Sequence, residues 1–408
     1  MAFRSAPSEN AFSTPQQEVA RIAGLRTVHQ ALYYLHSQEM EFRRRQLELA
    51  RVPGPPFGET ERTQWLQERF TDLRLPQVET DELGNVFGFL GSREAPFVAV
   101  SAHLDTVFPR DTQLGSREEG NKLYGPGISD NAAGVVAMLA VASAIQHAQL
   151  RPATNVVFIG NVGEEGEGNL RGMRHIFADP FWSEGIQSLL VIDGAGADTY
   201  VTQALGSRRF EVILRGPGGH SWSDFGVPNP IVLLSRALAA FSEVQLPELP
   251  RTTFNIGVIQ GGTSVNSIPE SAIARVDLRS ASMVELQKLE HRLREAVVSV
   301  LPRERPDARI SAEVRMIGDR PAGTLSSEAR ILQVIRAVDA HLGIKSMPRL
   351  ASTDANIPIS LHKEAITIGA GGDGGGAHTL HEWYDCSHRD LGLKRILLTL
   401  LTLAGVQE

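Results

Sequence analysis

The segment FVAVSAHLD, residues 97–105, begins as a continuous apolar run and ends on a histidine and an aspartate. A short apolar run of this kind predicts a buried strand over residues 97–101. Because side chains alternate along an extended chain, His103 and Asp105 are expected on the same side of its carboxyl end. An imidazole beside a carboxylate suits a metal ligand and the neighbour that orients it. It equally suits a buried histidine paired with an aspartate, and both interpretations stay open at this point.

Short apolar runs and helical patterns alternate on both sides of this segment. We predict buried strands over residues 155–160, 189–192 and 365–368, and helices over residues 132–148, 169–177 and 328–342. Buried strands that alternate with helices indicate an α/β sheet covered on both faces. The strands at residues 97–101, 155–160 and 189–192 each run into polar residues at the carboxyl end, which is the edge at which open α/β sheets bind ligands.

The N-terminal part of the chain carries helical patterns. Apolar residues recur at helix-like spacings between residues 18 and 52, which predicts one long helix, and a second amphipathic helix is expected over residues 59–73. A glycine–asparagine turn at residues 84–85 separates two strand-like runs, residues 78–81 and 86–90.

A different pattern begins near residue 208. Half-exposed strands and helices follow in the order β-α-β-β-α-β, over residues 209–214, 230–244, 253–259, 273–279, 284–300 and 309–316. This order is the split βαβ pattern of a small, ferredoxin-like α+β domain. We therefore expect an inserted domain at residues 208–318. It would divide a larger domain into residues 1–207, which include a helical extension at residues 1–50, and residues 319–408.

The composition excludes several classes of protein. Of the 408 residues, 42% are hydrophobic and 21% are charged, which is typical of a globular chain and not of a collagen-like or disordered one. The net charge of 40 − 47 = −7 gives no footprint for nucleic acid, and we interpret the basic run at residues 41–51 as a solvated helix face.

The expected location follows from what the sequence lacks. No apolar run reaches the length of a membrane span, and the first 17 residues lack the apolar stretch of a signal peptide. The single cysteine, Cys386, excludes an intrachain disulfide. We therefore expect a cytoplasmic protein with no membrane or nucleic-acid partner.

Three further acidic segments follow predicted strands or precede a predicted helix. Asp130 stands in GPGISDN before the alanine-rich helix, Glu164 and Glu165 follow the strand at residues 155–160, and Asp193 ends another strand. Two adjacent acids at a strand end repel each other unless a cation compensates them. The alternatives are a helix N-cap for Asp130, a solvated turn for the two glutamates, and a cap or turn for Asp193.

A fourth segment, GGGAHTLHEW at residues 374–383, contains His378 and His381. Its glycines allow the backbone to approach another group closely. Together with His103 and the acids, one of these histidines would complete a mixed His/Asp/Glu set. Such a set suits zinc, or cobalt or manganese, better than a thiolate site does. Two metal ions about 3.5–4 Å apart that share one carboxylate would use five such ligands.

Nine segments of the chain occur in the order of one known family. The sequence resembles the M20 metallopeptidases, co-catalytic zinc exopeptidases and amidohydrolases that include carboxypeptidase G2-like enzymes, tripeptidase T, carnosinase-like dipeptidases and aminoacylases. The matching segments are residues 101–105, 125–134, 163–172, 191–194, 216–221, 261–270, 277–279, 352–356 and 376–383. The resemblance begins near residue 50 and implies a mixed-sheet, zinc exopeptidase-type catalytic domain with an inserted lid or dimerisation domain.

The resemblance also implies a set of metal ligands. His103 and Asp193 would hold one divalent ion, Glu165 and His378 would hold the other, and Asp130 would bridge both. His378 is preferred over His381 because relatives often have a histidine four residues before a glutamate, and Glu382 stands at that spacing from His378.

Other residues acquire catalytic or substrate-binding roles from the same resemblance. Asp105 would hydrogen-bond His103 and fix its tautomer, and Glu164 would be the general base that takes the proton from a water held between two metals. His220, from GPGGHS, would stabilise the oxyanion, from a neighbouring subunit in dimeric relatives. Asn266 and Arg279 resemble substrate-contacting positions. Arg279 would grip a carboxylate, with an ion pair to Asp277 as the alternative.

The chain departs from the family at one position. Asn131 stands where many relatives have a second acid, so any shared acidic role there is lost. The peptide bond after Asp130 is cis in relatives, and a cis bond is expected here. Residues 352–356 resemble a segment of the pocket wall, although no single residue there receives a role.

The implied function is hydrolysis of an amide or peptide bond in a dipeptide, a tripeptide or an N-acyl amino acid. A homodimer formed through the inserted domain is expected by analogy. The alternatives are a non-catalytic metal-binding or scaffold relative, which a missing ligand would favour, and a phosphate-ester hydrolase. No phosphate-cradling loop is present to support the latter.

Overall fold

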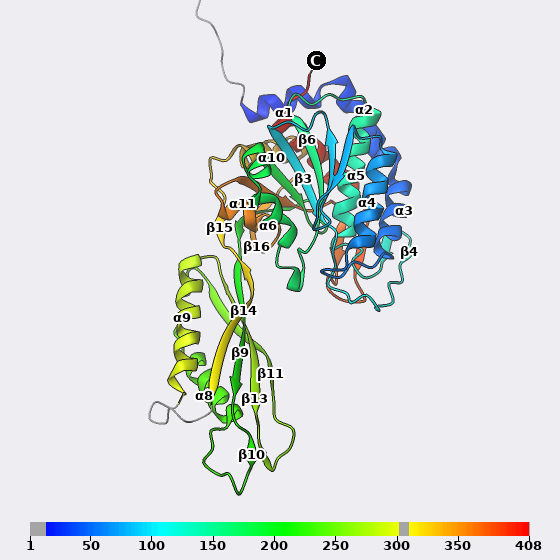
Figure 1. Cartoon of the computed structure of the whole chain (residues 1–408). Helices are drawn as coiled ribbons and strands as arrows, with labels where there is room; N and C mark the ends of the chain where they lie inside the picture. Colours follow the sequence, from blue (N-terminus) through cyan, green and yellow to red (C-terminus); the bar gives the residue numbers. More distant parts are fainter. Residues whose placement is uncertain (1–13, 302–309, 408) are drawn as a thin grey trace, which may run out of the picture.

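The computed structural model describes residues 14–301 and 310–407. A larger domain built around one sheet carries an elongated unit that projects from it (Figure 1). The sheet has nine strands in the order β1-β2-β6-β3-β7-β17-β8-β15, and β16 also pairs with β8. Its strands are β1 (Gln77–Thr80), β2 (Val86–Leu90), β3 (Phe97–His103), β6 (Asn155–Asn161), β7 (Ile186–Ile192), β8 (Thr199–Ala204), β15 (Gly323–Thr324), β16 (Met347–Ala351) and β17 (Glu364–Ile368).

Both faces of this mixed sheet are covered by helices, as the alternating pattern predicted. Strand β3 pairs in parallel with β6 and β7, whereas β2 pairs antiparallel with β6. One face packs against α1 (Pro15–Ala23), α2 (Arg26–Ser37), α3 (Glu39–Ala50), α4 (Thr60–Asp72), α5 (Ala132–His147), α10 (Arg330–Leu342) and α12 (Arg389–Ala404). The other packs against α6 (Arg171–Ala178), α7 (Pro180–Gly185) and α11 (Asn356–Ser360).

The side chains of β3 show how the sheet divides the core. Val98 and Val100 belong to the apolar cluster on the α5 face, and Phe97 and Ala99 belong to the cluster on the α6 face. This alternation is the ordinary pattern of a strand buried on both sides. Because the whole strand is buried, His103 and the residues that follow it are held firmly at the carboxyl edge.

One prediction for the N-terminal part is wrong. The long helix expected over residues 18–52 is three helices, α1 to α3, with breaks at residues 24–25 and at Gln38. Gly24 ends α1, and Leu25 adopts an extended conformation before α2 begins. The breaks let α1 pack on α10 and α12 while α2 and α3 pack on α5, which a single straight helix could not do.

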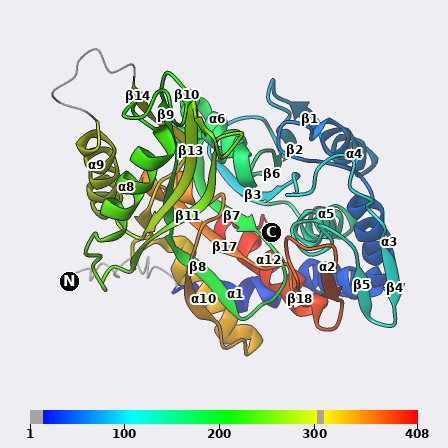
Figure 2. The same cartoon turned by 90° about the horizontal axis from the view of Figure 1, so that it is seen from below.

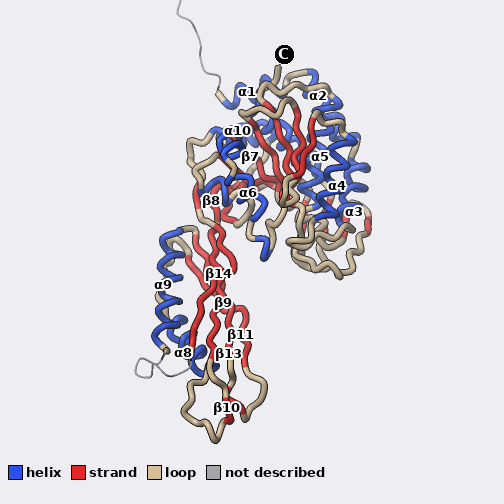
Figure 3. The backbone as a smooth tube through the Cα atoms, in the orientation of Figure 1, coloured by secondary structure: helices blue, strands red, loops and turns tan. Residues whose placement is uncertain are grey.

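The inserted unit follows the predicted β-α-β-β-α-β order. It contains β9 (Gly206–Arg215), α8 (Pro230–Ser242), β11 (Thr252–Gly261), β13 (Ser271–Ser280), α9 (Met283–Ser299) and β14 (Ser311–Arg320). Its four strands form an antiparallel sheet in the order β11-β13-β9-β14. Helices α8 and α9 cover one face of this sheet and leave the other open (Figure 3). Residue 309, where the last strand was expected to begin, lies outside the described residues.

A short antiparallel pair, β10 (Gly219–His220) and β12 (Ser267–Ile268), lies at the end of the inserted unit that is remote from the nine-stranded sheet (Figure 1). We call residues 219–226 and 262–268 the tip. The chain enters the inserted unit after β8 and rejoins the nine-stranded sheet at β15.

A small sheet near the carboxyl edge was not predicted. It has the order β18-β19-β5-β4, with β18 (Asp373–Gly375), β19 (Trp383–Asp385), β5 (Lys122–Tyr124) and β4 (Arg117–Glu119), which gather on one side of the larger domain (Figure 2). Pairing of β19 with β5 brings the glycine-rich C-terminal segment beside the loop that carries Asp130. The 3-10 helix η1 (Gly166–Gly168) follows β6 at the same edge.

Among residues 14–301 and 310–407, every helix is too short or too polar to cross a membrane. The expectation that the N-terminus lacks a signal peptide rests mainly on residues 1–13, which lie outside the described part of the chain.

Candidate metal centre and active site

Five side chains that the sequence singled out converge at the carboxyl edge of the sheet. They come from the end of β3, the loop before α5, the ends of β6 and β7, and the loop between β18 and β19, and they are His103, Asp130, Glu165, Asp193 and His378. We call these five residues the cluster. The segments that contribute them lie up to 275 residues apart in the sequence. They meet in space because parallel strands end at the same edge of the sheet.

The cluster contains two groups of possible ligands that share Asp130, and a third group joins His103 and Glu165 with the neighbouring Glu164. One group is His103, Asp130 and Asp193, the other is Asp130, Glu165 and His378, and the ligand atoms of each lie within 4.8 Å of one another. Asp130 turns its Oδ1 toward Nε2 of His103, at 3.1 Å, and its Oδ2 toward Nε2 of His378, at 3.2 Å. One carboxylate therefore faces both histidines, each with a different oxygen.

The orientation of His103 tests whether a cation fits. Its Nδ1 lies 3.1 Å from the main-chain oxygen of Asp105, which can only accept, so Nδ1 carries the proton. In the neutral ring the lone pair of Nε2 then faces carboxylate oxygens of Asp130 and Asp193, the second at 3.6 Å. Acceptors that face acceptors require a proton or a cation between them, so this donor set fits a metal ion.

The titration behaviour of the two histidines has the same origin. Burial lowers the pKa of His103, but its contacts with Asp105, Asp130 and Asp193 outweigh burial and leave this pKa well above its usual value. Contacts with Asp130 and Glu165 raise the pKa of His378 to about 10. Three acids beside two imidazoles thus give an excess of negative charge, which divalent cations would neutralise.

Asp105 contacts both His103 and the segment that carries the two glutamates. The main-chain carbonyl of Asp105 accepts the hydrogen bond from Nδ1 of His103, and the carboxylate of Asp105 lies 3.6 Å from the same nitrogen. That carboxylate instead accepts the main-chain N–H groups of Glu164, at 2.9 Å, and Glu165, at 2.7 Å. A fully buried Asp105 therefore fixes the histidine on one side and the two glutamates on the other.

The loop that carries Asp130 is held from two sides. The buried carboxylate of Glu382 accepts main-chain N–H groups of Gly127, Ser129 and Asp130 at 2.7–2.8 Å. Burial raises the pKa of Glu382 to about 7, although these N–H groups oppose the shift. On the other side, Nε2 of the buried Gln46, from α3, donates to the carbonyl of Ile128 at 2.6 Å. The N-terminal helices therefore contact the site directly.

Asn131 closes the same loop onto the next strand. It is the N-cap of α5, a position that the sequence offered as an alternative role for Asp130. Its side chain donates to the carbonyl of Ile192 at 2.9 Å and accepts the N–H of Gly194 at 3.2 Å, on both sides of Asp193. The peptide bond between Asp130 and Asn131 is cis, as expected. An amide at this position ties two ligand-bearing segments together, which a second acid could not do with the carbonyl of Ile192.

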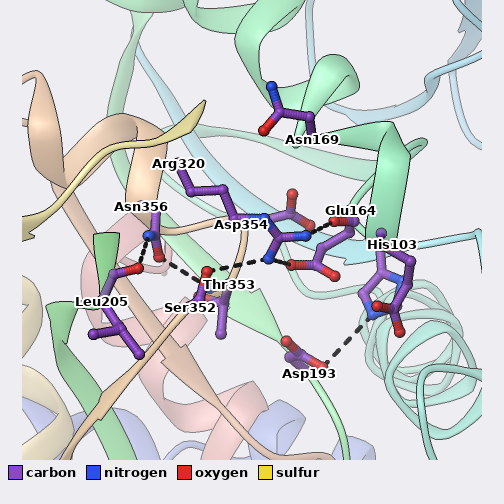
Figure 4. A network of polar contacts seen from close by, with 12 residues as sticks. His103, Glu164, Asn169, Asp193, Leu205, Arg320, Ser352, Thr353, Asp354 and Asn356 are labelled. Atoms are coloured by element: carbon purple, nitrogen blue, oxygen red, sulfur yellow. Dashed lines mark hydrogen bonds and ion pairs between the residues drawn. The ribbon is translucent and has the colours of Figure 1, made fainter. Parts of the chain in front are cut away.

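Glu164 lies beside the cluster and is paired with an arginine that the sequence did not single out. Arg320, at the end of β14, donates from Nη1 to Oε1 of Glu164 at 2.9 Å and to Oγ of Ser352 at 3.1 Å (Figure 4). Burial raises the pKa of Glu164 well above its usual value, although the charge of Arg320 opposes this shift. Glu164 is therefore a buried carboxyl group held through one oxygen at the junction with the inserted unit.

The predicted wall segment, residues 352–356, braces this junction (Figure 4). Asn356 donates to the carbonyls of Leu205 and Pro321, both at 2.9 Å, where the chain enters and leaves the inserted unit. Asp354 is fully buried and accepts from Asn161 at 2.6 Å, and burial raises its pKa to about 7. The segment thus fixes the entry and exit strands of the inserted unit beside the cluster.

A cavity of about 390 Å³ opens above the cluster. Three arginines of the inserted unit and its junction, Arg209, Arg279 and Arg320, line it together with carboxylates of the cluster and Glu164. Nε of Arg279 donates to Asp277 at 2.6 Å, so the ion pair considered as an alternative is present, and 43% of the Arg279 side chain remains exposed. The cavity therefore combines a possible metal site with cationic groups suited to a carboxylate.

Two predicted site residues lie elsewhere. His220 and Asn266 are at the tip, remote from the cluster (Figure 1), and are held together by the bond from the N–H of Ser221 to the carbonyl of Asn266. Nδ1 of His220 accepts main-chain N–H groups of Trp222 and Ser223 at 3.2 and 3.3 Å. The neutral ring therefore carries its proton on Nε2 and presents a donor to solvent.

Four residues that shape the site were missed from the sequence, namely Gln46, Arg62, Arg320 and, beyond its spacing from His378, Glu382. Arg62 is fully buried and donates to the carbonyls of Val52 and Leu104, and burial lowers its pKa to about 10. A charged residue on an otherwise apolar helix face was the available signal for Arg62. Arg320 stands directly before a proline at the expected end of the inserted domain, which was the signal there.

Comparison with known proteins places this geometry in context. The profile of peptidase family M20/M25/M40 matches residues 99–402. A probable carboxypeptidase of Uncinocarpus reesii is 26% identical over 248 residues, which are 55% of this chain and 55% of that relative. The chain thus aligns with only about half the length of the curated relatives it matches.

Solved structures share the fold over nearly the whole chain. A tripeptidase from Staphylococcus aureus superposes with a TM-score of 0.72 at 21% identity, and the match covers 90% of this chain and 98% of that one. A peptidase from Bacillus subtilis described as a dinuclear metal-binding member of the M20 family superposes with a TM-score of 0.64 at 14% identity, over 91% and 100% of the two chains.

Proposed function

This chain belongs to peptidase family M20/M25/M40, and on that premise we propose that it is a metal-dependent hydrolase of small amide substrates, namely dipeptides, tripeptides or N-acyl amino acids. The observation that carries the proposal is the pair of ligand groups that share Asp130, with the buried carboxylate of Glu164 beside them.

His103, Asp130 and Asp193 would hold one divalent ion, and Asp130, Glu165 and His378 would hold the other. A set of two imidazoles and three carboxylates is suited to zinc, with cobalt and manganese as close alternatives. When bound, the ions supply the positive charge that lowers the pKa of an attacking water and polarises the substrate carbonyl.

Glu164 is proposed as the general base. It lies outside the two ligand groups that share Asp130, although it forms a third possible group with His103 and Glu165. Its second carboxylate oxygen would take a proton from water and deliver it to the leaving nitrogen. Burial has raised its pKa, which brings the carboxylate closer to the basicity that such a transfer needs near neutral pH. Arg320 holds the other oxygen and would keep the group aimed.

The arginines of the cavity suggest which substrates fit. Arg279 is half-exposed and lines the cavity with Arg209. A guanidinium binds a carboxylate through two parallel hydrogen bonds. We infer that the substrate carries a free carboxylate on the leaving amino acid, as a dipeptide or an N-acyl amino acid does.

A homodimer would bring the tip into the site. His220 presents a free N–H donor but lies remote from the cluster of its own chain, so it would stabilise the oxyanion in a partner subunit, with Asn266 beside it. Trp222 and Phe225 at the same tip are 86% and 91% exposed, which is unusual for large apolar side chains and supports an assembly surface. We place the protein in the cytoplasm, because its single cysteine is buried and unpaired.

The test uses the full chain, freed of metal with a chelator and reloaded with zinc, cobalt or manganese. Dipeptides, tripeptides and N-acyl amino acids are then screened for hydrolysis. We expect activity only after reloading. Glu164→Gln should retain two metal equivalents, and its kcat should fall by a factor of about 10²–10⁴.

Glu184→Gln, an exposed glutamate on α7, is the matched control and should behave as the unaltered protein. Full activity of Glu164→Gln would exclude it as the base. A protein that stays free of metal after exposure to zinc would contradict the whole proposal and favour a scaffold role.

A further inference from the structure

A second cavity, of about 560 Å³, adjoins the one above the cluster. It lies between the open face of the inserted sheet and two segments of the larger domain, which contribute Phe57 and residues 166–167. Gly166 and Arg209 line both cavities, so the two meet at this pair of residues. Gly166 directly follows the cluster residue Glu165, so a ligand that reaches from one cavity to the other passes the site of the proposed chemistry.

The three arginines of the second cavity are paired with two of its acids. Glu211, which is 6% exposed, accepts from Nε of Arg275 at 3.1 Å and from Nη2 of Arg315. Arg209 donates from Nη1 to the carbonyl of Gly166 at 2.9 Å and lies 3.6 Å from Asp277. The charges of these three arginines are therefore already compensated, and Glu167 is the lining acid that lies outside these pairs. Arg275 and Arg315 instead present flat guanidinium groups, on which an aromatic ring can stack.

Apolar side chains stand at the margins of the same cavity. Ile317, on β14, is 37% exposed, and Phe57 is 68% exposed. The exposed lining is mostly carbon. An apolar recess that opens beside a polar catalytic cavity is the usual form of a small-molecule binding site.

Phe57 itself is held in a costly conformation. Its φ is +69°, in the left-handed region that non-glycine residues rarely adopt. It stands in the segment PGPPFG, and its ring packs against the guanidinium of Arg171 with 5.0 Å between group and ring centre. Because the side chain of Phe57 is exposed, its burial contributes little free energy to offset this backbone strain. Backbone outliers of this kind occur at ligand sites.

We propose that this second cavity is a subsite for an aromatic acyl group of the substrate. The proposal rests on the proposed function. If Arg279 holds the carboxylate of the leaving amino acid, the acyl part is the one that extends over Gly166 toward Phe57. There an aryl ring would pack on Phe57 and Ile317 and stack on the paired guanidinium groups. A small acyl group such as acetyl would leave the cavity empty.

The experiment compares the N-acetyl and N-benzoyl derivatives of the amino acid that is released fastest in the substrate screen. We expect kcat/KM for the benzoyl derivative to exceed that for the acetyl derivative by about tenfold or more. Phe57→Ala and Ile317→Ser should each remove most of this preference, because they lower kcat/KM for the benzoyl derivative far more than for the acetyl derivative. Tyr33→Ala, which removes an aromatic side chain of similar exposure on α2, should leave the preference intact.

Binding is measured separately by calorimetry in the Glu164→Gln background, where turnover is blocked. There the benzoyl derivative should bind about tenfold more tightly than the acetyl derivative, and only while Phe57 is present. Equal binding of both derivatives overturns the subsite, as does a preference that survives Phe57→Ala. Absence of hydrolysis for every substrate, with a Phe57-dependent preference in binding, would contradict the proposed function and leave the subsite supported.

Discussion

The cluster and the tip are opposite solutions to the placement of reactive groups. The five side chains of the cluster are held by buried strands, by Asp105 and by a loop fixed from two sides. His220 and Asn266 stand at the end of a projecting unit, on two-stranded pairing and exposed turns. All five side chains of the cluster come together within a single chain, whereas the tip residues lie remote from the cluster of their own chain.

The difference indicates a division of labour. Groups that hold metal ions must be placed to within a few tenths of an ångström, and a packed sheet edge provides that precision. A group that stabilises charge only during the reaction can arrive with closure of a domain or with a partner subunit. The predictions below separate these two kinds of contribution.

Loss of the shared ligand should have the largest effect. Asp130→Ala removes the one carboxylate common to both ligand groups, so both metal sites should weaken together. We expect metal content to fall well below two equivalents and activity to fall by more than about 10³. Metal analysis by mass spectrometry after dialysis measures the first effect. Two retained equivalents would show that the two groups do not depend on Asp130.

Loss of the tip histidine should be smaller and should leave the metals in place. His220→Ala removes one proposed oxyanion donor, for which we expect a loss of about 10²–10³ in kcat with unchanged metal content. Mixing this variant with Glu164→Gln then tests whether the group comes from a partner. After random reassortment about half of the dimers would be hybrids. In each hybrid one of the two sites combines an intact Glu164 with an intact His220 from the partner subunit, so about a quarter of all sites would regain activity.

The outcome of mixing separates two arrangements. Recovery of activity requires that His220 acts on the neighbouring subunit. If mixing restores nothing while His220→Ala alone is inactive, the histidine acts within its own chain after the inserted unit closes. If His220→Ala is fully active, the tip has no part in catalysis, and the division of labour drawn above is wrong.

The exposed aromatics of the tip should affect assembly more than folding. The double variant Trp222→Ser with Phe225→Ser removes two side chains that contribute little burial in one chain. We expect the free energy of unfolding to change by less than about 0.5 kcal/mol. The dimer should be weaker, so it should dissociate at protein concentrations at which the unaltered protein stays dimeric. Light scattering across a dilution series measures this. A dimer unaffected by the double substitution would place the assembly surface elsewhere.

The sequence predicted the parts of the fold that depend on local pattern. The strand at residues 86–90 coincides with β2, and α5 begins at Ala132 as expected, because continuous apolar runs and an alanine-rich helix leave few alternatives. The long N-terminal helix failed because its breaks are set by packing on α5, α10 and α12. Strand β8 and the small sheet of β4, β5, β18 and β19 were missed, because their strands are short or lack a clear apolar pattern.

The cluster was predictable for a different reason from its surroundings. Each of its residues lies in a sequence segment that matches the family, and the family resemblance implied the role of each residue. The residues that hold the cluster in place lie outside any such matching segment or received no role from it. Gln46 is an ordinary helical residue in the sequence, and only its burial against the loop of Asp130 shows a function.

Gln46 therefore gives the smallest but most specific test of the cluster as a preassembled site. It donates to the carbonyl of Ile128 and accepts from Nη2 of Arg389 at 2.5 Å, so it joins α3, the loop of Asp130 and α12. Gln46→Met keeps the approximate volume and removes both bonds. Supporting groups of this kind change metal affinity by about tenfold or more when they are lost, and we expect a loss near tenfold here.

The matched control is Leu49→Ala, a fully buried residue three positions along the same helix that makes no polar contact with the loop. It creates a cavity and should cost about 2–5 kcal/mol of folding stability, more than Gln46→Met. Chelator competition measures metal affinity for both. If affinity follows the hydrogen bond, only Gln46→Met weakens it, because the loop of Asp130 is released. If affinity instead follows stability, Leu49→Ala weakens it more, and the N-terminal helices then serve the fold without positioning the site.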